Sequence, residues 1–362
     1  MLSELEQTYL LALYQVKGIG NLALQAIHNQ QLSFQQVWED PELLVNHRII
    51  DRTVRDMLMV SKRYLTPEAC LDELSNAKCS YLTRWTSNYP SGLEQLHDVP
   101  AVLYYQGNAK LFSQVMVAIV GSRTATVYGK KVAASFGGQF GEAGLTVVSG
   151  VARGIDSAAH RAALATDGST IGVLGSGINV VYPPENMPLY QMIAENGLLL
   201  SEFTLGTKPS AGNFPRRNRI IAALAQAVVV VEANDKSGAL ITTDHALELG
   251  RDVWAVPGPI TSPQSRGTNG LIRDGALLAL EAGEIINSLV PGIQRGQLKP
   301  QTVSLTLEEG RIIEVIGEYP VHLDEIAASL DFPRGELSSL LLKLELKGII
   351  ICLAGNHYVR NN

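Results

Sequence analysis

The fold is decided by "VMVAIVGSRTATVYGKKVAASFGGQFGEAGLTVVSG" (115–150). An apolar, β-branched run at 115–120 passes through Gly121 into an Ala-rich segment near 129–143, and a second apolar run follows at 145–150. Continuous apolar strands that alternate with helices are typical of a parallel sheet with both faces covered. We therefore expect a strand, a glycine turn, a helix and a parallel strand here.

The same alternation continues to residue 258. Its expected strands are 169–175, 198–202, 227–233 and 252–258, and its expected helices lie near 154–166, 186–196, 216–226 and 239–250. The sequence thus predicts a Rossmann-like α/β domain with a doubly wound, mostly parallel sheet. Ligands of such sheets bind at the carboxyl ends of the strands, so we expect functional residues in the loops that follow them.

The segments on either side predict further domains. Apolar residues at helical spacing and the turn in "KGIGNLALQAIH" indicate a small helical domain of the SAM or helix-hairpin-helix type at 1–65. The α/β domain should span 66–289, with a strand-containing preface at 66–112. A Pro- and Gly-containing linker at 290–304 then leads to a winged-helix domain at 305–362, with helices at 323–330 and 335–347 and a two-strand wing.

Composition excludes several classes of protein. There is no run of 18 uncharged apolar residues, and "MLSELEQTYLLALYQ" carries acids where a signal peptide carries positive charge. We expect a cytoplasmic protein without a membrane partner. Three scattered cysteines suit neither a disulfide framework nor a four-ligand zinc site, and we expect no metal or cofactor. A net charge of −6 means that any polyanion must meet a local patch.

Several strand ends carry residues suited to binding an anion. Backbone amides in glycine turns before a helix can hold phosphate, and a neighbouring cation strengthens the contact. The candidates are Gly121, Ser122 and Arg123 in the first loop, Gly150, Arg153 and Gly154 in the second, and Lys236, Ser237 and Gly238 in the last. The alternative is that these glycines serve only the turns. His160, on an Ala-rich helix, is better explained as a hydrogen-bonded structural residue.

The segment "NFPRRNRIIAAL" (213–224) gathers cations at a helix entrance. No acidic residue occurs from Phe203 through Val231, whereas Lys208, Arg216, Arg217 and Arg219 all do. A surface salt-bridge network interleaves both signs, so this pattern favours an anion site. Phe214 then has two explanations that stay open: its ring stacks on a nucleic-acid base, or it packs onto its own helix as a hydrophobic staple.

Seven motifs together carry a family resemblance. In this order and spacing, "GSR", "SGVARGIDSAAH", "GSGINVVYPPEN", "LLLSEF", "FPRRNRIIAAL", "VVVVEANDKSGALITT" and "LGRDVWAVPG" resemble the DNA-processing protein A family (DprA, also called Smf). The resemblance covers roughly residues 80–280, and both flanking domains look like those of longer members.

The resemblance implies a function. Such a protein binds and protects incoming single-stranded DNA in natural transformation, dimerises through its Rossmann-like domain, and loads the recombinase RecA while displacing single-strand-binding protein. Carried onto this sequence, the family's DNA pocket would comprise Gly121, Ser122, Arg123, Gly150, Gly154, Phe214, Arg216, Arg217, Asn218 and Arg219. Some members place a basic residue in the Tyr-Pro loop. Here that loop contains Glu185, so Lys208 or another residue would have to substitute.

Charge also bears on the flanking domains. Residues 305–362 contain nine acids against five Lys or Arg, so we expect the winged helix to meet protein or its own chain rather than duplex DNA. Residues 1–65 balance seven acids with six bases, which favours a structural role. The main alternative function is an enzyme that binds or hydrolyses a nucleotide. We expect no catalytic residue, because neither a paired-glycine phosphoribohydrolase motif nor a hydrolase motif is present.

Overall fold

The computed structural model describes residues 2–166, 168–291, 306–317, 320–330, 332–346, 349–353 and 355–360. The chain divides into two compact units, residues 1–296 and 297–362, and each is considered by itself. The expected linker at 290–304 lies almost wholly outside the described residues.

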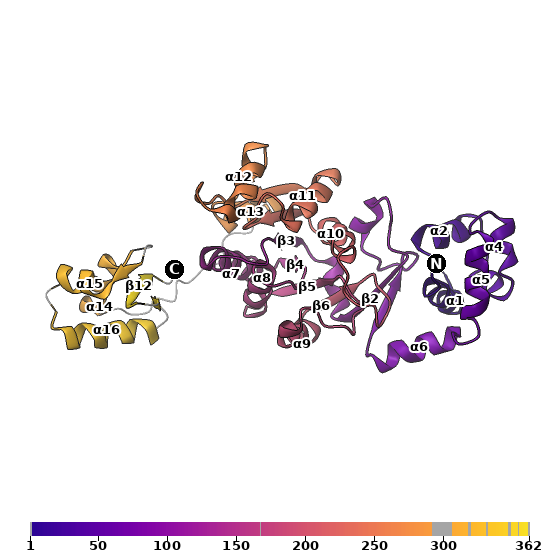
Figure 1. Cartoon of the computed structure of the whole chain (residues 1–362), viewed down its shortest axis with the longest axis horizontal. Coiled ribbons are helices and arrows are strands. Elements are labelled where there is room, and N and C mark those ends of the chain that lie inside the picture. Colours follow the sequence, from indigo (N-terminus) through magenta and orange to yellow (C-terminus); the bar gives the residue numbers. More distant parts are fainter. Residues whose placement is uncertain are drawn as a thin grey trace. The chain divides into compact units, whose positions relative to one another are not determined.

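The first unit begins with helices (Figure 1). They are α1 (Glu4–Tyr14), α2 (Asn21–Asn29), α3 (Phe34–Glu39), α4 (Glu42–Asn46), α5 (Arg52–Ser61) and α6 (Pro67–Asn76). Side-chain oxygens of Ser3, Ser33, Asp51 and Thr66 accept hydrogen bonds from amides in the first turns of α1, α3, α5 and α6, as N-caps do. The helix α6 falls inside the expected strand-containing preface. Its Cys70 and Leu74 belong to the same hydrophobic core as Leu10 of α1.

A nine-stranded sheet follows, in the order β1-β2-β6-β5-β4-β3-β7-β8-β9. Its strands are β1 (Ser80–Thr83), β2 (Val102–Gly107), β3 (Met116–Val120), β4 (Thr146–Ser149), β5 (Ser169–Leu174), β6 (Leu198–Ser201), β7 (Ala227–Val230), β8 (Asp252–Ala255) and β9 (Leu277–Leu278). The strands from β3 to β9 run parallel to one another, and β2 pairs antiparallel with both β1 and β6. This confirms the predicted Rossmann-like, doubly wound sheet.

Helices cover both faces of the sheet. Side chains of α7 (Val127–Glu142), α8 (Ile155–Leu164) and α13 (Ala282–Leu289) pack on one face. Those of α10 (Asn213–Leu224) and α11 (Gly238–Glu248) pack on the other. The helix α9 (Met187–Asn196) packs against β5 and β6, and α12 (Arg266–Arg273) precedes β9. Figure 1 shows α7 and α8 side by side against the strands.

The strand order reverses at β3. This strand pairs with β4 on one side and with β7 on the other, although the chain visits β4, β5 and β6 before β7. A crevice opens at such a switch point because the loops after the two central strands lead to opposite faces. The loop after β3 begins at Gly121 and the loop after β7 contains Asn234, so these two loops should border a binding site.

The second unit is small and has its own core. It contains α14 (Leu307–Val315), β10 (Val321–His322), α15 (Leu323–Ser329), α16 (Arg334–Leu346), β11 (Ile350–Leu353) and β12 (His357–Arg360). The strands form a sheet in the order β10-β12-β11, so a third strand joins the expected two-strand wing. Ile312, Ile326, Leu337 and Leu341 lie in the core between the helices.

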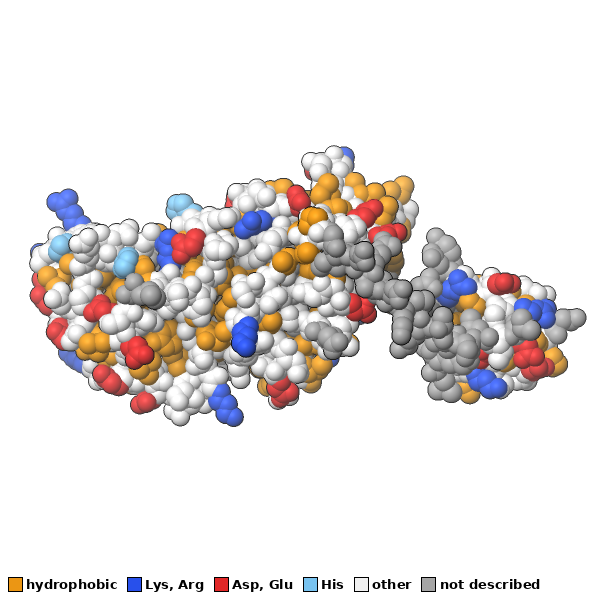
Figure 2. Space-filling view, turned by 180° about the vertical axis from the view of Figure 1, so that it is seen from behind, with side chains coloured by type: hydrophobic (Ala, Val, Ile, Leu, Met, Phe, Trp, Pro, Cys, Tyr) orange, Lys and Arg blue, Asp and Glu red, His pale blue; other side chains and the backbone are white. Residues whose placement is uncertain are grey.

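Positive charge is dispersed over one face of the molecule. On the face in Figure 2, Lys and Arg side chains are scattered among uncharged and acidic ones. Among the described residues, no helix is both long and apolar enough to cross a membrane.

Candidate nucleic-acid interface

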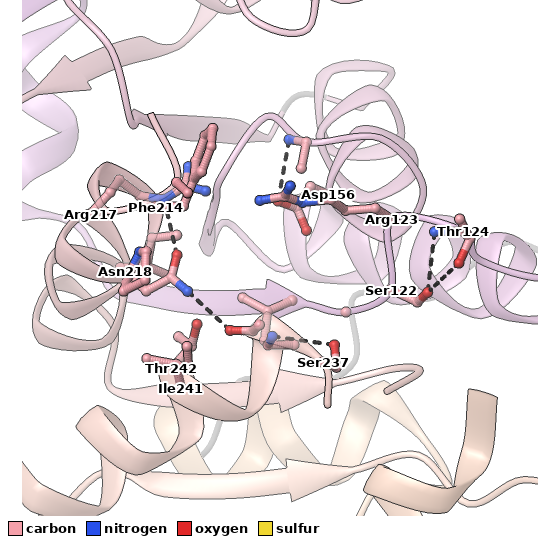
Figure 3. A pocket seen from close by; sticks show the side chains of 18 of the residues that line it. Ser122, Arg123, Thr124, Asp156, Phe214, Arg217, Asn218, Ser237, Ile241 and Thr242 are labelled. Carbon is pink, nitrogen blue, oxygen red and sulfur yellow. Dashed lines mark hydrogen bonds between the residues drawn. The ribbon is translucent and has the colours of Figure 1, made fainter. Parts of the chain in front are cut away.

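A pocket of about 660 Å³ lies at the carboxyl ends of β3 and β7, where the strand order reverses. Loops that follow β3, β4, β5, β6 and β7 contribute to its lining, together with residues of α10 and α11. Eight of the expected site residues line it: Gly121, Ser122, Arg123, Phe214, Arg217, Asn218, Ser237 and Gly238. Figure 3 shows side chains from α10 facing the loop that carries Arg123.

Hydrogen bonds and a close contact with Gly154 fix the loop after β3. The Ser122 amide donates to the Glu232 carbonyl at 2.7 Å, and the Thr124 amide donates to Ser122 Oγ at 3.2 Å. Gly154 lies beneath with a φ of +77°, and a Cβ at this position would stand 2.3 Å from the Ser122 carbonyl. Gly154 therefore supports the pocket loop without lining the pocket itself. The Arg123 side chain in the same loop is exposed to solvent.

Phe214 stands at the pocket wall in the first turn of α10. Its half-buried ring lies 5.6 Å from the ring of Tyr182, and the Arg123 guanidinium lies 4.8 Å from its centroid. A Cβ at Gly175 would approach the ring to 2.8 Å, so this glycine makes room for it. The aromatic ring and an exposed cation thus share one wall of the pocket.

Arg217 lies under the pocket and is buried. Its Nη1 donates to the Gly150 carbonyl at 2.6 Å and to the Val173 carbonyl, and its Nε donates to Asn218 Oδ1 at 3.1 Å. Burial lowers the Arg217 pKa to about 10, while Asp156 opposes the shift, so the guanidinium stays charged at neutral pH. Gly150 does not line the pocket, but its carbonyl holds this cation in place.

Asp156 is the acidic side chain of the lining. Burial raises its pKa, and Arg217 opposes this shift. Its Oδ2 accepts hydrogen bonds from the amides of Gly150 and Ala152 at 3.1 and 3.3 Å. The carboxyl group therefore fastens the loop after β4.

Arg216 and Arg219 do not line the pocket. They donate to the same oxygen, Glu202 Oε1, at 2.9 and 2.5 Å, and Asn21 Nδ2 donates to it at 2.9 Å. The Arg219 Nη1 also donates to the Asp98 carbonyl at 2.5 Å, and the Glu202 side chain is fully buried. The stretch of sequence around these two cations contains no acid, but the fold brings Asp98 and Glu202 to them. They join α10 to the N-terminal helices.

The remaining expected cations lie outside the lining. Arg153 is exposed and pairs with Glu185, the acid of the Tyr-Pro loop. Lys208 and Lys236 are exposed and do not line the pocket. Arg123 and Arg217 are thus the two cations that line it, one exposed and one buried.

Comparison with known proteins identifies the family. The family model of "DNA recombination-mediator protein A" matches residues 80–290, and that of the "DprA winged helix domain" matches residues 297–356. The chain belongs to the DNA recombination-mediator protein A family. The predicted resemblance and the predicted winged-helix domain are both confirmed.

The similarity to known relatives covers most of the chain. Protein Smf of Synechocystis sp. is 33% identical to this chain over 98% of this chain and 99% of its own length. The X-ray structure of DNA processing protein A from Streptococcus pneumoniae matches with a TM-score of 0.68 and 33% identity, over 78% of this chain and 98% of that one. DprA of Helicobacter pylori, solved for its single-stranded DNA binding mode, matches with a TM-score of 0.54 and 32% identity, over 59% of this chain and 95% of that one.

Several residues line the pocket of this family member without having been expected there. They are Val120, Thr124, Ala152, Asp156, Tyr182, Pro209, Ser210, Ala211, Pro215, Ile221, Asn234, Ala239, Ile241 and Thr242. Most are small or weakly polar, which leaves little signal in a single sequence. The ring of Tyr182 lies beside that of Phe214 at the pocket wall.

His160 is buried away from the pocket. His160 is fully buried, its Nδ1 lies 2.6 Å from Thr170 Oγ1, and burial lowers its pKa to about 3. It does not line the pocket. In the described part of the chain, no three His, Cys, Asp or Glu side chains lie close enough together to hold a metal ion.

Proposed function

We propose that this chain binds single-stranded DNA in the pocket at the carboxyl ends of β3 and β7. The supporting observation is the pairing of an exposed guanidinium, Arg123, with the half-buried ring of Phe214 at one wall. Arg123 and the amide of Gly121 would hold phosphate, while Phe214 would offer a stacking face that accepts any base. The single-stranded DNA binding mode named for the Helicobacter pylori relative supports single-stranded DNA as the ligand.

Arg217 has a separate role in this proposal. Its Nη1 and Nε donate to protein oxygens, so its charge acts on the phosphate through the pocket floor. Low dielectric surroundings strengthen such an interaction. Asn218, Ser237 and Gly238 add polar lining on the side of α11. We assign Arg216 and Arg219 to positioning α10, because their donors are engaged with Glu202 and Asp98.

The test is a titration of the full chain with single-stranded and duplex oligonucleotides over a range of salt concentrations. We expect tighter binding of single strands and a linear fall of log K with log salt, as phosphate contacts require. A parallel screen for nucleotide hydrolysis covers the alternative enzyme. Turnover of a nucleotide, or equal binding of duplex and single strand independent of salt, would reject the proposal.

We extend the proposal to the pathway that the resemblance in the sequence implies. In the cytoplasm, the chain would protect incoming single strands during transformation, displace single-strand-binding protein and load RecA. A protein that binds the phosphates and stacks on the bases of a single strand competes with other single-strand-binding proteins for the same phosphates and bases. The test is RecA filament formation on a strand coated with single-strand-binding protein. Equal rates with and without the chain would reject this role.

We also propose a homodimer through the Rossmann-like domain. The strand β9 ends the sheet, and Leu277, Leu278 and Leu280 around it are 42%, 42% and 61% exposed. An unpaired edge that carries leucines is suited to pairing with another chain. A second copy, with the same edge, fits a two-fold contact.

A further inference from the structure

We propose that this chain has a second nucleotide site, at the amino ends of the parallel strands, in which Arg251 binds a phosphate group. A pocket of about 250 Å³ lies where β3, β7 and β8 begin. We call it the Arg251 pocket. Arg251 belongs to the "LGRDVWAVPG" motif. Its guanidinium does not line the single-stranded DNA pocket described above.

The Arg251 guanidinium is available for a ligand. Its Nε is buried and has no hydrogen-bond partner, and its other nitrogens form no hydrogen bond or ion pair with any described residue. The ends of α10 and α11 lie nearby, and helix C-termini favour cations. Even so, none of their carbonyls accepts a hydrogen bond from this side chain. A buried donor without a partner is uncommon in folded proteins.

The other polar side chains of the lining are neutral and can donate hydrogen bonds. Gln226 Oε1 accepts a hydrogen bond from the Met116 amide at 2.7 Å, which leaves the amide nitrogen of Gln226 as a donor. Gln95, Gln114 and Ser91 also line the pocket, and no lining residue is acidic. A guanidinium with several neutral donors suits a phosphate, which offers more acceptor oxygens than a carboxylate.

Gly92 allows the backbone to approach closely on one side of this pocket. A Cβ at Gly92 would lie 2.2 Å from the Ala223 carbonyl and 3.6 Å from Arg251 Nη2. The glycine thus lets the short helix at Ser91–Gln95 close against the end of α10 and the arginine.

An adjoining pocket of about 430 Å³ provides space for the rest of a nucleotide. It shares Pro90, Ser91 and Phe112 with the Arg251 pocket, and it also contains Tyr89 and Lys110. The half-buried ring of Phe112 therefore borders both spaces. A phosphate on Arg251 would place the attached sugar and base beside this ring, where a base can stack.

This site is separate from the single-stranded DNA pocket. The helix α10 begins at the first pocket and ends at the second, and its 12 residues span about 18 Å. The ligand is a nucleotide phosphate, either in a free nucleotide or in a strand. Neither pocket needs the other, so the proposal stands if Arg123 proves not to bind DNA.

The experiment is equilibrium dialysis of the full chain with labelled thymidine 5′-monophosphate and with inorganic phosphate. It is performed in an Arg123→Gln background, which weakens the first pocket. Adding Arg251→Gln should reduce binding of both probes at least tenfold, since a charge-assisted contact is lost. Adding Arg273→Gln is the matched control, because that exposed arginine pairs with Asp274 and lines neither pocket. Phe112→Leu should weaken the nucleotide but not inorganic phosphate.

The outcomes separate the possibilities. Unchanged binding of both probes after Arg251→Gln would overturn the proposal. If this variant does not fold, Ser91→Ala decides, with a loss of roughly fivefold expected for one hydrogen bond and no loss counting against the site. An oligonucleotide that displaces the monophosphate identifies a strand as the ligand, and monophosphate that stays bound identifies the free nucleotide.

Discussion

Two arginine-to-alanine substitutions separate DNA contact from structural support. Arg123 is exposed and lines the pocket, whereas the Arg219 side chain is 10% exposed and pairs with a fully buried Glu202. Each substitution removes one positive charge, so both change the net charge equally. Any difference between them must come from where the charge lies.

The magnitudes follow from these surroundings. Arg123→Ala removes one charge-assisted contact of about 1.5–3 kcal/mol, which corresponds to a loss of affinity of about 10- to 150-fold. The slope of log K against log salt should fall by about 0.7, the value for one phosphate on a single strand. Thermal stability should change by less than about 1 kcal/mol, because the side chain is exposed and loses only its cation–π contact with the Phe214 ring.

Arg219→Ala should act on stability instead. Removing one member of a buried ion pair costs about 3–5 kcal/mol. Arg216 and Asn21 still donate to Glu202, so we expect the lower end, about 3 kcal/mol. In a domain of this size this lowers the melting temperature by about 6–12 °C.

The assays are fluorescence anisotropy with a labelled single strand at several salt concentrations, and thermal unfolding followed by circular dichroism. The folded Arg219→Ala protein should keep the parental salt slope. Glu202→Gln is the companion variant, and it should destabilise the fold without changing the slope. A stable Arg219→Ala protein with a reduced slope would refute the reasoning, as would an unchanged slope for Arg123→Ala.

Three further predictions follow from single residues. Phe214→Leu should weaken single-strand binding by about 1–3 kcal/mol without changing the salt slope, because stacking involves no phosphate. Fluorescence anisotropy measures the affinity and the slope. An unchanged affinity would favour the explanation that Phe214 packs onto its own helix as a hydrophobic staple. The His160 pKa is about 3 in the fold against 6.5 for a free imidazole, so the unfolded chain takes the proton first. Between pH 7 and 5 the parent should therefore lose about 2 kcal/mol more stability than His160→Gln, measured by urea unfolding; equal losses would contradict this. Leu278→Lys, at the exposed edge strand, should convert a dimer to a monomer in light scattering, and a persistent dimer would place the interface elsewhere.

The course of the main chain in the α/β domain was largely predictable from sequence. Apolar runs predicted the strands β3 to β8, because a strand buried on both faces needs continuous apolar residues. Helix α10 nevertheless begins at Asn213 rather than near 216, since Pro215 fits a first helical turn, where its missing amide proton costs nothing. The short β9 and the helix α6 were not predicted. Both depend on contacts with neighbouring elements more than on their own pattern.

The sequence by itself determined the doubly wound sheet and the glycine loops at its strand ends, because periodicity and turn residues act over a few neighbours. Only the tertiary structure decided which cations remain available to a ligand. Arg216, Arg217 and Arg219 stand within four positions of one helix, yet only Arg217 lines the pocket. The partners of the other two, Asp98 and Glu202, come from distant parts of the chain. Pairing of charges depends on distance in space, and one sequence does not contain those distances.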